Sequence, residues 1–208
     1  MTFNKVVFDI ETTMTADKIW CIVCKHGDTY YQFREDKLHR FEEFIKQSEE
    51  VIGHNIIGFD IPVVNKIFGY DLFKNCKVTD TLVMSRVLNP MIEGGHSLKN
   101  WGMKLGQKKI PFEQFDFFTE DMLKYCRNDV EVTERLYKFL INKTKDFGQS
   151  IELEHKVATI IQKQHEKGFK LDIINAYELQ CQFQEDMNDL TSKVRESFPP
   201  LKEEKTFI

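Results

Sequence analysis

Two acidic residues, separated by a single residue, lie at the end of an apolar segment near the start of the chain. The segment Lys5-Val-Val-Phe-Asp-Ile10 is rich in β-branched and aromatic residues, which favours a strand. Because side chains alternate along a strand, Asp9 and Glu11 share one face and Phe8 and Ile10 the other. Two neighbouring carboxylates suit chelation of a cation. In a chain with 33 acidic residues, such a pair also commonly just marks a solvated strand end.

Two further segments carry carboxylates at positions of interest. In Gly53-His-Asn55-Ile-Ile-Gly-Phe-Asp60, Asp60 follows a turn and begins a predicted helix, so it is either a helix N-cap or a carboxylate near a metal. Asn55 offers an amide for a substrate backbone. Farther along, Tyr125 and Asp129 are four residues apart on one helix face, which Val132 and Leu136 continue as an apolar surface. Asp129 should therefore point inward, where a carboxylate needs a partner such as a cation.

These residue types predict hydrolysis of a phosphodiester bond. That reaction needs a water nucleophile at neutral pH and neutralisation of charge on the leaving oxygen, which two divalent ions roughly 3.5–4 Å apart supply. Carboxylates are the ligands that Mg²⁺ or Mn²⁺ prefers. The hypothesis is that Asp9 bridges both ions, Glu11 and Asp129 complete the tighter site, and Asp60 holds the second ion largely through water. Tyr125, a phenol with an ordinary pKa near 10, would stay protonated and orient the attacking water.

The elements that must position these residues read as an α/β sheet. Residues 19–25 and 30–34 predict a hairpin that turns at 26–28, so three antiparallel strands open the fold. Helical spacing then begins at Lys37 and is followed by a short strand at 51–54. Further elements are predicted as a helix at 60–68, a strand passing into a helix at 78–88, a short helix at 96–105, and a long helix that Thr119 caps and that runs to about Lys143.

The pattern breaks at residues 146–150, and only helices follow. One helix is predicted at about 151–167 with Gly168 as its stop, and a second begins after Asp172 and ends near Ser197. Residues 199–208 are charged and predict a loose tail. The sequence therefore predicts a domain at residues 1–147 and a helical segment at 148–208.

Composition limits the classes of protein to consider. A chain of 208 residues with 41% hydrophobic content can bury a full core, and no run approaches the ~18 apolar residues that span a bilayer. We therefore expect no membrane partner and a cytoplasmic location, in the host cytoplasm if the protein is viral. The net charge of -4 is not that of a protein that coats duplex DNA. Five cysteines predict reduced thiols, and Cys21 and Cys24 should face opposite sides of a strand, which argues against zinc.

The order of these segments resembles a known family. Asp9-x-Glu11, Asn55 to Asp60, and Tyr125-x-x-x-Asp129 resemble the three exonuclease motifs of the proofreading domain of DNA polymerases, in the subclass with Tyr in the third motif. Residues 79–86 and 96–106 resemble the family A polymerases of short-tailed coliphages in particular. The resemblance covers the chain to about residue 145. It implies the ribonuclease H-like exonuclease fold, a mixed five-stranded sheet flanked by helices, here followed by an all-helical C-terminal appendage.

The resemblance also implies an activity. It predicts metal-dependent 3′-to-5′ removal of nucleotides from single-stranded or mispaired DNA 3′ ends, with release of nucleoside 5′-monophosphates and with two Mg²⁺ or Mn²⁺ ions as cofactors. An exoribonuclease of the same fold is the first alternative, because the acidic core attacks phosphate and does not read the 2′-OH. Residues 151–172 resemble the helices that lead into the polymerase domain of family A enzymes, and the sequence stops before the palm and fingers.

A second alternative is a docking subunit with little activity of its own. Its partner would be a separate polymerase, bound through the helices from Ile151 to Ser197, which carry apolar positions such as Leu179, Phe183, Met187 and Leu190.

Several residues are candidates for holding a nucleic acid strand. Met14 and Phe59 flank the acidic residues and could wedge against or stack on the terminal base, as aromatic side chains do with any base. Core packing is the equal alternative for Phe59. Lys99 could contact phosphates, and a solvated helix face is at least as common a role for it. The same two readings apply to its neighbours Lys104, Lys108 and Lys109.

Overall fold

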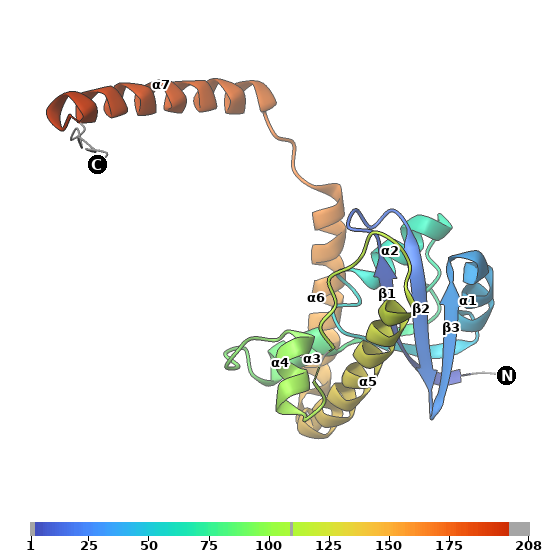
Figure 1. Ribbon diagram of the computed structural model, residues 1–208. Helices are drawn as coiled ribbons and strands as arrows, with labels where there is room; N and C mark the ends of the chain where they lie inside the picture. Colours follow the sequence, from blue (N-terminus) through green and yellow to red (C-terminus); the bar gives the residue numbers. More distant parts are fainter. Residues whose placement is uncertain (1–2, 109, 200–208) are drawn as a thin grey trace, which may run out of the picture. The chain divides into compact units, whose positions relative to one another are not determined.

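The computed structural model describes residues 3–108 and 110–199, whose strands form a mixed sheet in the order β3-β2-β1-β4-β5 (Figure 1). β2 pairs antiparallel with both β1 and β3, whereas β4 pairs parallel with both β1 and β5. The predicted five-stranded sheet and its three opening antiparallel strands are confirmed. The strands are β1 (Phe3–Thr12), β2 (Ile19–His26), β3 (Thr29–Arg34), β4 (Ser48–Gly53) and β5 (Lys77–Asp80).

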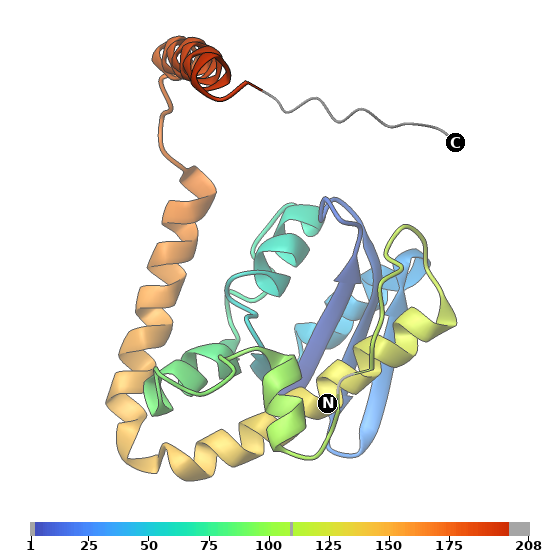
Figure 2. The same cartoon turned by 60° about the vertical axis from the view of Figure 1, so that its left-hand side comes forward.

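Helices cover both faces of the sheet. Because successive residues of β1 point to opposite sides, this strand contributes side chains to a core on each face. Phe8 and Ile10 enter a core shared with α1 and α2, whereas Val7 enters a second core shared with α3, α4 and α5 (Figure 2). Cys21 and Cys24 likewise lie in different cores, so their predicted opposite orientation is confirmed. The helices on this sheet are α1 (Leu38–Ile45), α2 (Asp60–Phe68), α3 (Thr81–Leu88), α4 (Leu98–Lys104), α5 (Glu120–Lys143) and α6 (Gly148–Lys167).

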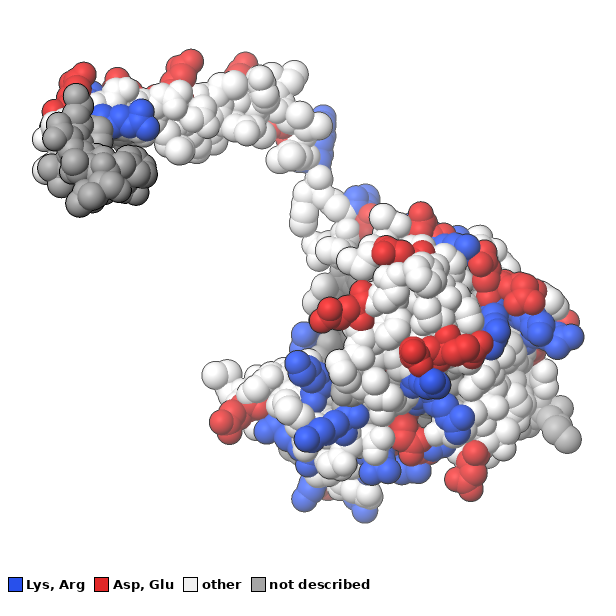
Figure 3. Space-filling model, viewed as in Figure 1, with Lys and Arg blue, Asp and Glu red and all other residues white. Residues whose placement is uncertain are grey.

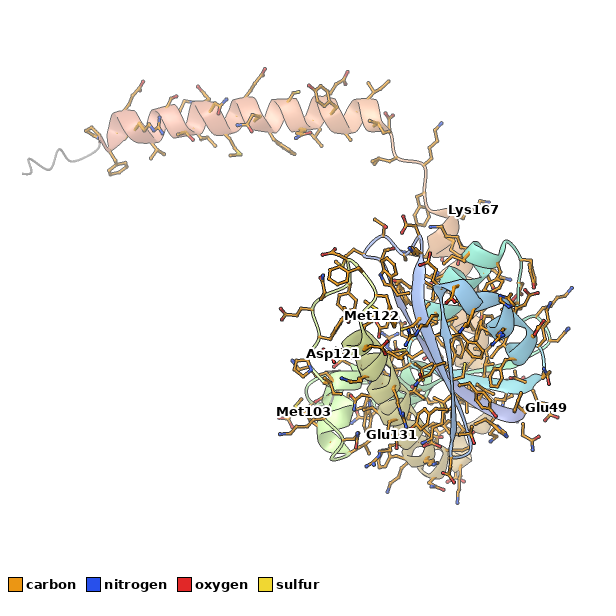
Figure 4. The ribbon with its side chains drawn as sticks, turned by 45° about the vertical axis from the view of Figure 1, so that its right-hand side comes forward. Glu49, Met103, Asp121, Met122, Glu131 and Lys167 are labelled. Carbon is orange, nitrogen blue, oxygen red and sulfur yellow. The ribbon has the colours of Figure 1, made fainter. Side chains whose placement is uncertain are left out.

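Local signals in the sequence set most helix ends. Gly69, at φ 79°, ends α2 in the left-handed conformation that glycine tolerates. The Thr119 side chain accepts a hydrogen bond from the Met122 amide and begins α5 as predicted. On α5, Met122 is fully buried against the sheet and Asp121 points outward (Figure 4). The fourth helix begins at Leu98 rather than at His96, because the Ser97 side chain caps the Asn100 amide.

Contacts between residues divide the chain into two compact units, residues 1–166 and 167–208. Most of α6 belongs to the first unit, on which it packs. Ala158 joins the core of α1 and α2, and Ile151 joins the core of α5. Among the described residues of the second unit is α7 (Ile173–Ser197), which Asp172 caps as predicted. Two expectations concern residues outside the described ranges. They are the phosphate contact considered for Lys109 and the loose tail predicted to include residues 200–208.

Charges alternate over the visible surface of the protein. On the face seen in Figure 3, Lys and Arg lie between Asp and Glu rather than forming one continuous basic surface. All five cysteines fall within the described ranges and are free thiols, as predicted. None of the helices described has the length and apolar character needed to cross a membrane.

Candidate active site

The central strand β1 carries the first two carboxylates. Asp9 pairs with Val23 of β2 and Glu11 with Cys21, so both acidic residues lie within the sheet rather than beyond its end. Glu11 is buried and Asp9 is half-buried. A carboxylate oxygen of Asp9, one of Glu11 and the sulfur of Cys126 all lie within 4.8 Å of one another. The two acidic residues are therefore close enough to share one cation.

Cys126 on α5 is the neighbour that the sequence analysis missed. Its Sγ lies 3.4 Å from the backbone oxygen of Asp9 and 3.5 Å from Asp9 Oδ2. Burial raises the pKa of this thiol well above its ordinary value, and the charges of Asp9 and Glu11 act in the same direction. Cys126 therefore remains a thiol that donates to Asp9. Its position three residues before Asp129 on one helix was the signal that could have revealed it.

Asp60 is the first residue of α2 and is buried. The N-cap position belongs to Phe59, whose side chain makes no capping bond, so Asp60 does not serve as the N-cap. Burial raises the pKa of Asp60 to about 8, and the negative charges of Asp80 and Asp129 act in the same direction, while backbone N–H groups of Asp60 and Ile10 oppose the shift. A nearby cation would reverse this balance and favour the carboxylate.

α5 supplies the remaining pair of predicted catalytic residues. Asp129 is buried, and Tyr125, one turn earlier, is half-buried. Val132 and Leu136 are fully buried below them, which is the apolar face expected from the sequence. The helix therefore turns its acid and its phenol toward the sheet strand that carries Asp9.

An aromatic cluster holds the ring of Tyr125. Phe112 stacks on it with ring centroids 5.3 Å apart and an interplanar angle of 29°, and Phe115 meets it edge-on at 6.3 Å. The indole N–H of Trp20 donates to the Phe115 backbone oxygen at 2.9 Å, which ties the segment between α4 and α5 to β2. Sequence patterns gave no sign of this cluster, because the segment has neither helical nor strand periodicity.

The four acids and Tyr125 meet in one cleft of about 340 Å³. Its walls contain the five predicted catalytic residues and three of the four predicted substrate contacts, whereas Lys99 lies on the exposed side of α4 and is not part of the lining. Larger clefts of about 700, 550 and 660 Å³ adjoin α6, and none of them includes the five predicted residues. The 340 Å³ cleft is lined by Asp9, Ile10, Glu11, Thr12, Thr13, Met14, His54, Asn55, Phe59, Asp60, Phe115, Tyr125 and Asp129.

The donors in this cleft fit hard divalent cations. Three of the four acids, Glu11, Asp60 and Asp129, are buried, and no Lys or Arg occurs among the described residues of the lining. Buried carboxylates that converge without a cationic side chain are compensated by bound metal ions in many proteins. Oxygen ligands of this kind suit Mg²⁺ or Mn²⁺, and the Cys126 thiol beside Asp9 stays protonated.

Comparison with known proteins places this geometry in a fold family. No family model matches the sequence. The chain is 22% identical to the DNA-directed DNA polymerase of Enterobacteria phage T3 and 23% identical to that of Escherichia phage T7, over 93% of its length in each case. It spans 37% of the length of each polymerase. The expected resemblance to phage polymerases is confirmed.

Solved structures with the same arrangement decide the fold. Brucella melitensis NrnC bound to pGG superposes with a TM-score of 0.63 at 19% identity, over 82% of this chain and 89% of NrnC. NrnC with bound Mg²⁺ gives 0.60 at 19% identity, over 79% and 86%. The Nibbler EXO domain of Aedes aegypti gives 0.57 at 13% identity, over 73% and 85%. The chain has the ribonuclease H-like exonuclease fold. Within this exonuclease fold, the cleft lies where β1, α2 and α5 converge.

Proposed function

We propose that the protein is a metal-dependent 3′-to-5′ exonuclease that acts on single-stranded or mispaired DNA ends. The observation that carries the proposal is the convergence of Asp9, Glu11, Asp60 and Asp129 in one cleft from three separate elements. The phage polymerase relatives and the nuclease structures of the same fold support it. Mg²⁺ in one NrnC structure supports a divalent cofactor.

In this proposal Asp9, Glu11, Asp60 and Asp129 would hold two Mg²⁺ or Mn²⁺ ions. Bound divalent ions would supply an activated water and neutralise charge on the leaving 3′ oxygen. Tyr125 donates a hydrogen bond that orients the attacking water, and its ring cannot swing away because Phe112 stacks on it.

The rim of the cleft fits the last base of a strand. Met14 is 82% exposed and Phe59 is 40% exposed, and both line the cleft beside the acids. Exposed apolar side chains at this position can stack on a base of any identity, which suits an enzyme without sequence preference. The Asn55 amide lies in the same lining and can hold the strand backbone. Products would be nucleoside 5′-monophosphates.

A degradation assay tests the proposal. A primer labelled at its 3′ end and mispaired there should release labelled mononucleotide with Mg²⁺ and none with EDTA. Asp9→Ala combined with Glu11→Ala should abolish release while the circular dichroism spectrum is kept. The matched control is the double variant Glu43→Ala and Glu49→Ala, which removes two exposed carboxylates outside the cleft (Glu49 is labelled in Figure 4). This control should keep the parent rate. Retained activity in the first double variant would reject the assignment.

An exoribonuclease of the same fold is the second candidate, and the NrnC structure bound to pGG supports binding of a single-stranded nucleic acid. The acidic residues of the cleft would act on the phosphate, which RNA and DNA share. Matched single-stranded DNA and RNA of one sequence separate the two candidates. Faster hydrolysis of DNA supports the first, and faster hydrolysis of RNA supports the second.

The helical C-terminal region could also bind a polymerase. We propose residues 1–147 as the catalytic domain and 148–208 as the segment that connects it to such a partner. On α7, Leu179, Phe183, Met187 and Leu190 are each at least half exposed, as expected of an apolar face that docks elsewhere. Replacing Phe183 and Met187 by Ser should weaken capture of a family A polymerase without changing nuclease rate, and unchanged capture would remove this role.

A further inference from the structure

The loop between β4 and α2 carries much of the cleft lining on an unusual backbone. His54, Asn55, Phe59 and Asp60 all come from this segment. Asn55 has φ 62°, in the left-handed region that costs free energy for residues other than glycine. No sheet ladder fixes the segment beyond Gly53, where β4 ends. The Gly58 and Phe59 amides donate to the Asn55 backbone oxygen at 3.1 and 3.0 Å, and further bonds reach the loop from the residues where β5 ends and α3 begins.

Tight packing shows how little freedom the loop has. A Cβ at Gly53 would lie 2.8 Å from the Ile56 side chain, and a Cβ at Gly58 would lie 2.7 Å from Asn55 Oδ1. The loop folds back on itself so closely that a side chain at either position would have to displace the Ile56 or the Asn55 side chain. A shift of the Asn55 backbone would thus move its neighbours, including the start of α2.

Asp80, at the end of β5, holds the amide groups of this loop. Its Oδ1 accepts from the Asn55 amide at 2.9 Å and from the Leu82 amide at 2.8 Å, and its Oδ2 accepts from the Ile57 amide at 3.1 Å. Asp80 is only 2% exposed, so water does not compete for these bonds. It therefore caps α3 and fixes the left-handed turn at the same time.

Thr81, the next residue, holds the carbonyl side of the loop. Its hydroxyl donates to the Gly53 backbone oxygen at 3.0 Å and lies 2.9 Å from His54 Nδ1. Because the one hydroxyl hydrogen goes to Gly53, the imidazole must donate to Thr81 Oγ1. The Thr81 side chain is fully buried, so neither bond can be replaced by bulk water.

We infer that Asp80 and Thr81 are positioning residues that set the β4–α2 loop, and through it Asp60, in the geometry that metal binding requires. This inference rests on the proposed function for its consequence in catalysis. Neither residue touches the reacting atoms. Displacing a catalytic group by about 1 Å can cost on the order of a hundredfold in rate, so a loop-setting pair has a large effect from outside the site.

Amide hydrogen exchange tests the role of Asp80 directly. Asp80→Asn replaces one acceptor oxygen by an amide that donates, so the Asn55 or Ile57 amide should exchange about tenfold faster or more, while β1 amides keep their protection. The matched control is Asp71→Asn, because Asp71 also accepts from a backbone amide, that of Phe73 at 3.1 Å, outside the 340 Å³ cleft. Unchanged exchange at both loop amides in Asp80→Asn, or equal acceleration there in Asp71→Asn, would overturn the inference.

Thr81 offers a second test that does not depend on Asp80→Asn folding. Thr81→Val keeps the shape and removes the hydroxyl, whereas Thr81→Ser keeps the hydroxyl. Mn²⁺ affinity by calorimetry and kcat on the labelled primer should both fall about tenfold or more in Thr81→Val, with KM little changed, and both should return to within about twofold of the parent in Thr81→Ser.

These measurements separate the inference from the proposed function. If the parent binds Mn²⁺ more tightly than Thr81→Val and releases no nucleotide, the nuclease proposal fails while the positioning role stands. If the parent degrades the primer and Thr81→Val matches it in both affinity and kcat, the positioning role fails alone. Equal impairment of Thr81→Ser and Thr81→Val would also overturn it, because the hydroxyl would then be irrelevant.

Discussion

Replacing Asp60 by Asn should change how the stability of the metal-free protein depends on pH. The pKa of Asp60 is raised from 3.8 to about 8 in the folded protein, because burial and the charges of Asp80 and Asp129 disfavour the carboxylate. Between these values the folded state keeps a proton that the unfolded state has lost. The free energy of unfolding therefore falls as pH rises, by about 1.4 kcal/mol per pH unit from this group. The side-chain amide of Asp60→Asn does not titrate, so the variant escapes this loss.

The expected magnitude follows from a window inside that interval. From pH 5.5 to 7.5, the free energy of unfolding of Asp60→Asn should gain about 2–3 kcal/mol relative to that of the parent. Urea titrations in EDTA, followed by the fluorescence of Trp20 and Trp101, give both values at each pH. Groups that titrate alike in both proteins cancel in the difference.

Two results would refute this reasoning. If the parent and the Asp60→Asn variant show parallel stability curves across the window, Asp60 is ionised in the folded metal-free protein, and burial does not dominate its pKa. If the variant instead loses stability relative to the parent as pH rises, the Asp60 carboxylate is stabilised by the fold. In either case the cleft would not need cations to compensate its buried acids.

Three further outcomes are expected. Tyr125→Phe should lower kcat about 10²-fold while Mn²⁺ affinity measured by calorimetry stays at the parent value, and an equally fast variant would exclude a water-orienting role. Phe112→Ala should lower kcat in the same assay by releasing the Tyr125 ring, but should add nothing to Tyr125→Phe in the double variant; additive losses would contradict the coupling. Leu136→Ala should lower the free energy of unfolding by about 2–5 kcal/mol in urea, because Leu136 is fully buried on the inner face of α5, and a loss below about 1 kcal/mol would mean that the core there is loosely packed.

Local periodicity was sufficient to predict the parts of the site that lie within single elements. Alternation along β1 placed Asp9 and Glu11 together, and helical spacing placed Tyr125 and Asp129 together. The turn residues around Asp60 located the start of α2 at the residue where it begins. The mixed five-stranded sheet and the fold were predicted by the resemblance of the combined motifs, and the roles assigned to the side chains remain predictions.

Contacts between distant segments were beyond the sequence patterns. Asp80 accepts from the amide of Asn55, and nothing in the composition of either segment indicates that β5 and the β4–α2 loop meet. Phe112 and Phe115 pack on Tyr125 from a segment without regular structure, so no periodicity marked them. The packing of Ala158 and Ile151 of α6 on the two cores was likewise not indicated by the apolar spacing of that helix.

The sheet ends at β5, a strand of only four residues, and an edge strand exposes main-chain groups that can recruit strands from other molecules. Here the Asp80 amide donates to His155 Nε2 of α6 at 2.7 Å, and His155 Nδ1 in turn donates to the Ile151 backbone oxygen at 2.7 Å. A side chain thus occupies a donor that could otherwise begin intermolecular β-pairing. Loosening α6 should therefore make the protein prone to aggregate even where its cleft is intact.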